Sequence, residues 1–515
     1  MTLVAALAAL AATAALAATR HGIALSPDSV SYLSAARNLA AGRGYLDFTG
    51  APDTTFPPLF PAAVAVGNLL GWSLSTSARL VNAGSFAAIV ALSWMLLRRH
   101  VDATVVRVAA LVVIACSPVL LDVSAKAWSE PLFCALLLAF VLVLERATGN
   151  VDSRLRLTAA AGLIAGVAVL VRYVGVSLIV TGVVVYALFP FGAAMRRRAM
   201  RSAVFVLTAA PLPVLWLVRN AESGASRVLG PRVALPGSPW AVVREFLVAT
   251  AGMVAAPTAR LIFLLCAPPL AALVVIGAVD ASRRLRCGDR RSGGATSVTL
   301  VVFVAVYSAM LLVAGKMSGA SVDARTVMPL YVPLVVLIAR FADEGRSAWV
   351  ARAADHPRRS LCGPVALGSV TVCLVITVFA FATTSWDDGR TARGYGSASA
   401  RPATIAAAVR SLDDDALVVT NHPWTLYTAT AHEPVLPTPG PLYPSVSIAP
   451  ATLGQIASAA CSEPVYLAWF AQGAGAARPP NLGADVVVSV QRSWADGTLY
   501  LVRPSPGAHC VPGIS

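Results

Sequence analysis

Residues 78–97 read ARLVNAGSFAAIVALSWMLL, a mostly apolar run of the length that crosses a bilayer as one helix, and Arg98-Arg99-His100 follow it directly. Similar runs recur along the chain. Of the 515 residues, 57% are hydrophobic and 13% are charged, well below the roughly 25% charged residues of soluble domains. This composition excludes a disordered chain, a nucleic-acid-binding tail protein and an ordinary cytosolic enzyme. It indicates a polytopic α-helical membrane protein.

Eleven apolar runs are long enough to span a membrane: 3–19, 78–97, 104–121, 131–145, 157–171, 174–192, 203–218, 259–279, 297–314, 326–341 and 361–383. A further run at 57–71 is short and contains Pro57, Pro58 and Pro61. If it also spanned, Arg98-Arg99-His100 and every later basic cluster would lie outside, against the positive-inside rule. We therefore interpret 57–71 as an interfacial or re-entrant segment.

The charges predict the orientation. The net charge is +15, and the excess lies in short basic clusters between apolar runs, which is typical of cytosolic loops. With the N-terminus inside, loop 20–77 lies outside the cytosol, and so do the loops 122–130, 219–258 and 315–325 and the tail 384–515. The run 3–19 is interpreted as a retained helix; the alternative is a cleaved signal peptide, which leaves loop 20–77 outside as well.

The chain therefore divides into a transmembrane module, 1–383, and an exported domain, 384–515. The tail is predicted to be a small α/β domain. Its expected elements are a helix at 402–412 and strands at 416–420, 464–470, 484–490 and 498–502. Cys461 and Cys510 are its only cysteines; they form either a disulfide or two buried free thiols.

The segment 26–45, SPDSVSYLSAARNLAAGRGY, follows the first span. Tyr32, Ala35, Ala36 and Leu39 share one helical face, so we expect an amphipathic helix at the outer interface. Asp28 lies in its first turn. Two interpretations remain open from these residues: Ser26-Pro27-Asp28 is an ordinary helix start, with an N-cap and an acid that complements the dipole, or Asp28 is a functional carboxylate.

A second acid and several cations are expected in the same compartment. Glu130 begins a span after the loop that contains Lys126, and it is either a first-turn acid or a functional one. Arg172, Arg219 and Arg325 each lie at the outer end of a span. Each could simply snorkel to headgroups, or it could bind a phosphate bidentately. No nucleotide-binding or hydrolase motif occurs in a supporting context.

Several stretches in order resemble the GT-C-type glycosyltransferases that use polyprenyl-phosphate sugars, the group that contains protein O-mannosyltransferases and lipid A aminoarabinose transferases. The stretches are DSVSYLSAARNLAAGRGY at 28–45, PPLFP at 57–61, SEPLF at 129–133, VRYVG at 171–175, WLVRN at 216–220 and DARTVMPLY at 323–331. The resemblance covers residues 1–340, and an exported tail also fits it.

The resemblance implies an inverting transfer of a sugar from a polyprenyl-phosphate donor to a glycan, lipid or protein hydroxyl. Asp28 would be the general base, and Glu130 would orient the acceptor or bind a divalent metal. Arg172 and Arg325 would neutralise the departing phosphate, with Lys126 and Arg219 as further donor-phosphate candidates. Two other functions remain open: a transporter or flippase of a lipid-linked substrate, and a non-catalytic assembly protein. No nucleic-acid partner is expected.

Overall fold

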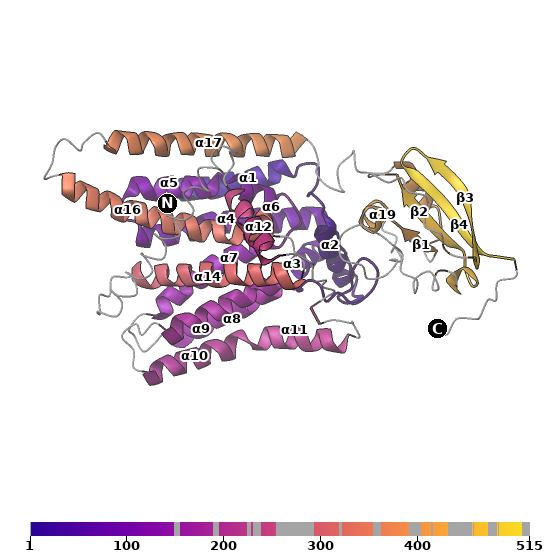
Figure 1. The fold of residues 1–515 in the computed structure, drawn as a ribbon, viewed down its shortest axis with the longest axis horizontal. Coiled ribbons are helices and arrows are strands. Elements are labelled where there is room, and N and C mark those ends of the chain that lie inside the picture. Colours follow the sequence, from indigo (N-terminus) through magenta and orange to yellow (C-terminus); the bar gives the residue numbers. More distant parts are fainter. Residues whose placement is uncertain are drawn as a thin grey trace.

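The structure is a computed structural model that describes residues 2–148, 155–188, 195–223, 228–229, 238–253, 293–318, 322–353, 362–390, 403–413, 416–430, 456, 458–471, 482 and 484–506. Figure 1 shows a long helical bundle with a small separate sheet beyond one of its ends. The helices of the first half are α1 (Thr2–Ala18), α2 (Pro27–Ala40), α3 (Leu59–Leu69), α4 (Leu74–His100), α5 (Thr104–Ala115), α6 (Pro118–Ser124), α7 (Glu130–Thr148), α8 (Leu155–Val171), the 3-10 turn η2 (Tyr173–Gly175) and α9 (Val176–Leu188). The later ones are α10 (Met195–Ala209), α11 (Pro211–Glu222), α12 (Pro239–Ala251), α14 (Gly293–Ser318), α15 (Ala324–Val327), the 3-10 turn η3 (Met328–Leu330), α16 (Tyr331–Ala353) and α17 (Cys362–Arg390).

The structure confirms that this is a multi-pass membrane architecture. Among the described residues, 6 helical stretches are long and apolar enough to cross a bilayer, and 4 shorter apolar helices accompany them. Ten of the expected runs coincide with helices, and the eleventh, 259–279, lies outside the described residues. Two of the runs bend at a proline, because proline lacks the N–H that continues a helix. The breaks lie at Pro118, between α5 and α6, and at Pro211, between α10 and α11.

The two ends of the bundle differ in charge. Helix α4 has 27 residues and is therefore about 40 Å long. At its first turn the Oγ of Ser75 accepts a hydrogen bond from the backbone N–H of Ile23, just before α2. At its last turn Arg99 pairs with Glu145 at 3.1 Å. The basic cluster at 98–100 thus lies at the opposite end of the bundle from α2, as the charge pattern predicts.

The short run at 57–71 forms α3, which packs beside α2 at the end of the bundle (Figure 1). Phe60 and Val64 face inward and are fully buried against the α2 residue Tyr32. Val66, Leu69 and Trp72 are exposed on its other side. This amphipathic arrangement agrees with an interfacial segment, and the 11 residues of α3 are too few to span.

The C-terminal part is the expected small α/β domain. It contains α18 (Ala403–Arg410), β1 (Leu417–Thr420), α19 (Pro423–Thr430), β2 (Val465–Phe470), β3 (Val486–Trp494) and β4 (Gly497–Pro504). The sheet order is β1-β2-β4-β3, with β1 parallel to β2 and the other pairs antiparallel. At Gly497 an added Cβ would lie 2.5 Å from the Trp469 carbonyl oxygen, so only glycine fits this hairpin turn.

This domain lies at the same end of the bundle as α2. The ring of Phe48, in the loop after α2, lies 6.1 Å from that of Tyr427 on α19, and the two bury Val30 of α2 between them. The guanidinium of Arg37 on α2 lies over the same Tyr427 ring. Cys461 is disulfide-bonded, so it is not a free thiol; Cys510 lies outside the described residues.

Candidate active site

Two loops that are remote in sequence are joined next to α2. The backbone N–H of Ala24 donates to the carbonyl of Ala125 at 2.9 Å, and the N–H of Ala127 donates back to Ala24 at 3.1 Å. The side chain of Asn82 on α4 donates to the carbonyl of Lys126 at 2.6 Å and so ties the loop before α7 to α4. These bonds place the start of α2 beside the start of α7, where the two acids predicted from the sequence lie.

The start of α2 is capped by Ser26. Its Oγ accepts the backbone N–H of Ser29 at 3.3 Å, and the indole N–H of Trp128 at 2.7 Å. The cap expected from the sequence is therefore present, and Ser26 provides it. The side chain of Asp28 makes a different contact: it reaches out of the helix to a guanidinium that follows it by 297 positions.

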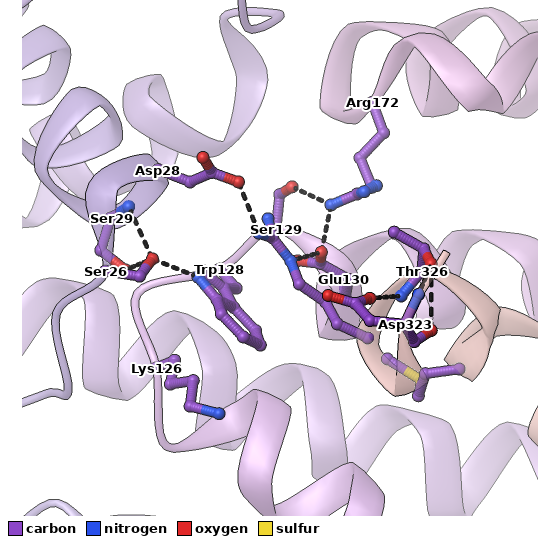
Figure 2. Close-up of polar contacts among 12 residues, drawn as sticks. Ser26, Asp28, Ser29, Lys126, Trp128, Ser129, Glu130, Arg172, Asp323 and Thr326 are labelled. Carbon is purple, nitrogen blue, oxygen red and sulfur yellow. Dashed lines mark hydrogen bonds and ion pairs between the residues drawn. The ribbon is translucent and has the colours of Figure 1, made fainter. Parts of the chain in front are cut away.

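Four charged side chains form one cluster (Figure 2). Oδ2 of Asp28 lies 2.5 Å from Nη1 of Arg325. The Nε of the same arginine donates to Oε1 of Glu130, and Nη1 of Arg172 lies 2.5 Å from that same oxygen. The other oxygen of Glu130, Oε2, is buried and has no hydrogen-bond partner. Two carboxylates and two guanidiniums thus balance each other in charge at the end of the bundle.

Local structure fixes each arginine. Asp323 caps α15 through a capping box with Thr326, so the single turn that carries Arg325 is well defined. The Arg325 guanidinium also lies over the ring of Trp128, 4.1 Å from its centroid, in a cation–π contact. Arg172 is an extended residue, φ −151°, between α8 and η2, and this break in the helix turns its side chain toward Glu130.

The members of the cluster differ in access to solvent. The Glu130 side chain is 0% exposed, whereas that of Asp28 is 20% exposed and those of Arg172 and Arg325 are 16% and 15% exposed. Asp28 and both arginines thus keep part of their surface open to solvent, and Glu130 keeps none. Burial lowers the pKa of Arg172, but the Glu130 carboxylate more than offsets this and the pKa is raised, so the guanidinium stays charged. The accessible groups are one carboxylate and two permanent cations.

Lys126 and Arg219 lie outside this cluster. The Lys126 ammonium pairs with Asp122 at 2.7 Å and lies over the Trp128 ring at 4.4 Å, so it borders the cluster through that indole. Arg219 donates to two backbone carbonyls of the loop between α2 and α3, those of Asp53 and Tyr45, each at 2.9 Å. Its contacts support the fold of the loop, and the structure does not bring it to Glu130.

Sequence reasoning missed three residues that shape the site. Trp128 joins Ser26 to Arg325, and Tyr32 contacts the site through the hydroxyl of Ser129, which is the third of these residues. Ser129 immediately precedes Glu130, which is the only signal that could have identified it. Tyr32 fits the apolar face of α2 equally well as a packing residue, so no pattern separated its hydroxyl from its ring.

The cluster does not suit a divalent cation. Within the described ranges, no group of three or more His, Cys, Asp or Glu side chains is arranged to hold a metal ion. The two carboxylates that could donate, Asp28 and Glu130, are both bound by Arg325. A dication bound by these carboxylates would have to displace the guanidiniums that pair with them.

Comparison with known proteins supports this view of the fold. No family model and no curated protein sequence matches the chain. ArnT from Cupriavidus metallidurans bound to undecaprenyl phosphate superposes with a TM-score of 0.61 at 15% identity, over 97% of this chain and 98% of that one. Archaeal oligosaccharyltransferase AglB from Archaeoglobus fulgidus, in complex with an inhibitory peptide and a dolichol-phosphate, has a TM-score of 0.50 at 10% identity, over 89% and 69% of the two chains. Arabinofuranosyltransferase AftD from Mycobacteria has a TM-score of 0.53 at 15% identity, over 99% of this chain and 40% of that one.

All three similar structures are glycosyltransferases of the GT-C class, which use polyprenyl-phosphate-linked donors. The chain therefore has the GT-C fold, as the resemblance in its sequence implies. At 10 to 15% identity the likeness concerns the fold. The chemistry must be argued from the residues of the site.

Proposed function

We propose that this protein transfers a sugar from a polyprenyl-phosphate donor to a hydroxyl acceptor at the outer face of the membrane, with inversion at the sugar and with Asp28 as the general base. The observation that carries the proposal is the accessible Asp28 carboxylate 2.5 Å from Arg325, which shares the buried Glu130 with Arg172. One group that accepts a proton and two that bind a phosphate thus lie side by side, at the end of an apolar helical bundle.

The proposed reaction uses each accessible group once. Asp28 accepts the proton of the acceptor hydroxyl while that oxygen attacks the anomeric carbon. The bond from this carbon to the phosphate oxygen breaks, and the electron pair leaves with the polyprenyl phosphate. Arg172 and Arg325 stabilise the charge that develops on the leaving phosphate. Glu130 is too buried to touch the acceptor, so we assign it the role of holding the two arginines together.

Glycosyltransferases of known structure support the donor class. The similar ArnT structure contains undecaprenyl phosphate and the AglB structure a dolichol-phosphate. By analogy, the donor of this chain would be a polyprenyl-phosphate sugar and the acceptor a glycan, lipid or protein hydroxyl. The C-terminal α/β domain contacts α2 through Val30 and Arg37, at the same end of the bundle as the site, which is a place from which to meet the acceptor.

The test is a transfer assay with purified protein and a panel of polyprenyl-phosphate sugars. Asp28→Asn should lower turnover by roughly 100-fold or more, the usual size of a lost general base. The exposed Asp102→Asn, at the far end of α4, is the matched control and should leave turnover unchanged. Product anomer analysis should show inversion. Full activity in Asp28→Asn, or lipid transport with no transfer by the native protein, would refute the proposal.

Orientation is tested separately in cells. We propose that α2 and the C-terminal domain lie outside the cytosol. A cysteine at the exposed position 51, in the loop after α2, should then react with an impermeant maleimide added to intact cells, whereas a cysteine at 102 should react only after lysis. The reverse labelling pattern would place the site on the cytosolic face and would exclude transfer at the outer surface.

A further inference from the structure

Helix α2 contacts the candidate site at two points one turn apart. Asp28 reaches Arg325, and four residues later the hydroxyl of Tyr32 lies 2.9 Å from the Oγ of Ser129. Positions i and i+4 lie on the same face of a helix, so both side chains point toward α7. Tyr32 therefore belongs to the wall of the site, although it carries no charge.

Ser129 also contacts Arg172. Its Oγ accepts a hydrogen bond from Nη1 of Arg172 at 3.2 Å. The same Nη1 pairs with Glu130, the residue that follows Ser129, so the guanidinium is bound by two neighbouring side chains of one turn (Figure 2). Guanidinium has donors only, which makes the Ser129 hydroxyl the acceptor in this contact.

These contacts close a ring. It runs from Tyr32 to Ser129, Arg172, Glu130, Arg325 and Asp28, and it returns to Tyr32 along the backbone of α2. Each arginine lies between two partners, so neither guanidinium can move without breaking a contact in the ring. Networks of this kind in a buried setting limit the geometries available to their members.

Packing holds the tyrosine end of the ring in place. The Tyr32 ring lies 4.6 Å from that of Phe56 and 5.2 Å from that of Phe60, and the residue is 1% exposed. Burial raises the pKa of Tyr32 well above its ordinary value, so the phenol is neutral and can donate to Ser129. The position of its hydroxyl is therefore fixed. Ser129 hydrogen-bonds to this hydroxyl, and Arg172 hydrogen-bonds to Ser129.

We propose that Tyr32 and Ser129 are positioning residues for donor binding. They fix the position of the Arg172 guanidinium beside Arg325, so that both arginines can bind one phosphate. This inference rests on the proposed function, because it assigns the phosphate of the donor to that pair. It predicts an effect on donor and product affinity, with the proton transfer at Asp28 left largely intact.

The test compares Tyr32→Phe with Tyr186→Phe. Both variants remove a buried hydroxyl that contacts a Ser or Thr hydroxyl and both keep the ring, but the Tyr186 hydroxyl lies 3.2 Å from Thr158 inside the bundle, away from the site. In Tyr32→Phe we expect KM for the donor, and the inhibition constant of free polyprenyl phosphate, to rise together by roughly three- to tenfold, the range for one net hydrogen bond. Turnover should fall by no more than the same factor, because Arg172 also stabilises the charge that develops on the leaving phosphate, and Tyr186→Phe should match the native protein in all three.

Two further variants separate positioning from a general loss of structure. Ser129→Ala should reproduce the effect of Tyr32→Phe, and Ser129→Thr, which keeps the hydroxyl, should restore most of the affinity. In an Arg172→Lys background, Tyr32→Phe should raise the donor KM little further, because the arginine that Tyr32 is proposed to position is already absent. Equal melting temperatures for Tyr32→Phe and Tyr186→Phe would show that both variants fold.

The possible results are distinct. Unchanged donor KM and product inhibition in Tyr32→Phe, with an active native protein, overturn the positioning role and leave the proposed function standing. An equal loss in both tyrosine variants also overturns it, since that is a stability effect. A native protein that neither transfers sugar nor binds polyprenyl phosphate refutes the proposed function, and the positioning role falls with it.

Discussion

Nη1 of Arg172 lies 2.5 Å from Oε1 of Glu130, a carboxylate whose side chain has no exposed surface. Because Arg325 binds the same oxygen, a single buried oxygen is the shared partner of two guanidiniums that would otherwise repel each other. The second carboxylate oxygen, Oε2, is left without a hydrogen-bond partner. Glu130 thus binds both arginines from the buried side of the site, and Asp28 is the more exposed of the two carboxylates.

Glu130→Gln should damage both folding and activity. The amide keeps the size of the side chain but leaves two buried guanidiniums without their shared counter-charge, and a broken buried ion pair costs about 3–5 kcal/mol. We expect a clear fall in melting temperature in detergent and loss of transfer. Glu344→Gln breaks the Arg340–Glu344 pair, in which the glutamate is 50% exposed. This control should cost less than about 1 kcal/mol. Equal losses in the two variants would contradict a central role for Glu130.

Trp128→Phe should weaken the connection between α2 and Arg325. Phenylalanine cannot donate to Ser26, and its smaller ring is a poorer partner for the Arg325 cation. Together these losses are worth about 1–2 kcal/mol, or roughly a tenfold fall in kcat/KM. The control is Trp386→Phe on α17, whose indole is 66% exposed and lies 5.8 Å from Arg390. If kcat/KM were unchanged in Trp128→Phe, the indole would not be holding Arg325.

Asp53→Asn should change how stability depends on pH. Burial raises the pKa of Asp53 to about 7 in the folded protein, while an unfolded aspartate titrates near pH ~3.9. Between these values the folded state binds more protons than the unfolded state, so the free energy of unfolding falls as pH rises and then levels off above about pH 7.

Asparagine does not titrate, so the free energy of unfolding of the variant should not show this fall with rising pH. At pH ~8 we expect it to be more stable than the native protein, by about 1–4 kcal/mol. Its remaining oxygen can still accept from the backbone of Thr55 and Phe56, as Oδ1 of Asp53 does at 2.8 and 3.3 Å. Melting curves at acidic and alkaline pH check this, and parallel pH profiles for the native protein and the variant would contradict it.

Tyr427→Ala should loosen the contact between the C-terminal domain and the loop that follows α2. The change removes the ring beside Phe48 and the cation–π partner of Arg37. Hydrogen exchange should speed up for amides around Phe48 by roughly tenfold, equivalent to about 1–2 kcal/mol of local stability. Amides of β2 should keep their protection, which shows that the domain itself stays folded. Unchanged exchange around Phe48 would mean that α19 does not hold this loop.

Local patterns in the sequence determined the elements of this protein. Within the part of the chain that the structure describes, apolar runs of span length became helices. The basic residues after 97 lie at the far end of the bundle, and the four predicted strands formed one sheet. The same patterns placed Asp28 and Glu130 at the starts of α2 and α7. Periodicity and capping depend on residues within a few positions of each other, so the sequence alone suffices for them.

Only the tertiary structure decided which side chains meet. The sequence offered Lys126, Arg172, Arg219 and Arg325 on equal terms, and packing brought only Arg172 and Arg325 to Glu130. Arg325 follows Asp28 by 297 positions, and no local rule relates two residues at that separation. Their pairing depends on how α2, α7 and α15 are packed around one buried carboxylate. The same packing brings Tyr32 to Ser129 and Ser129 to Arg172, contacts that their sequence context did not indicate.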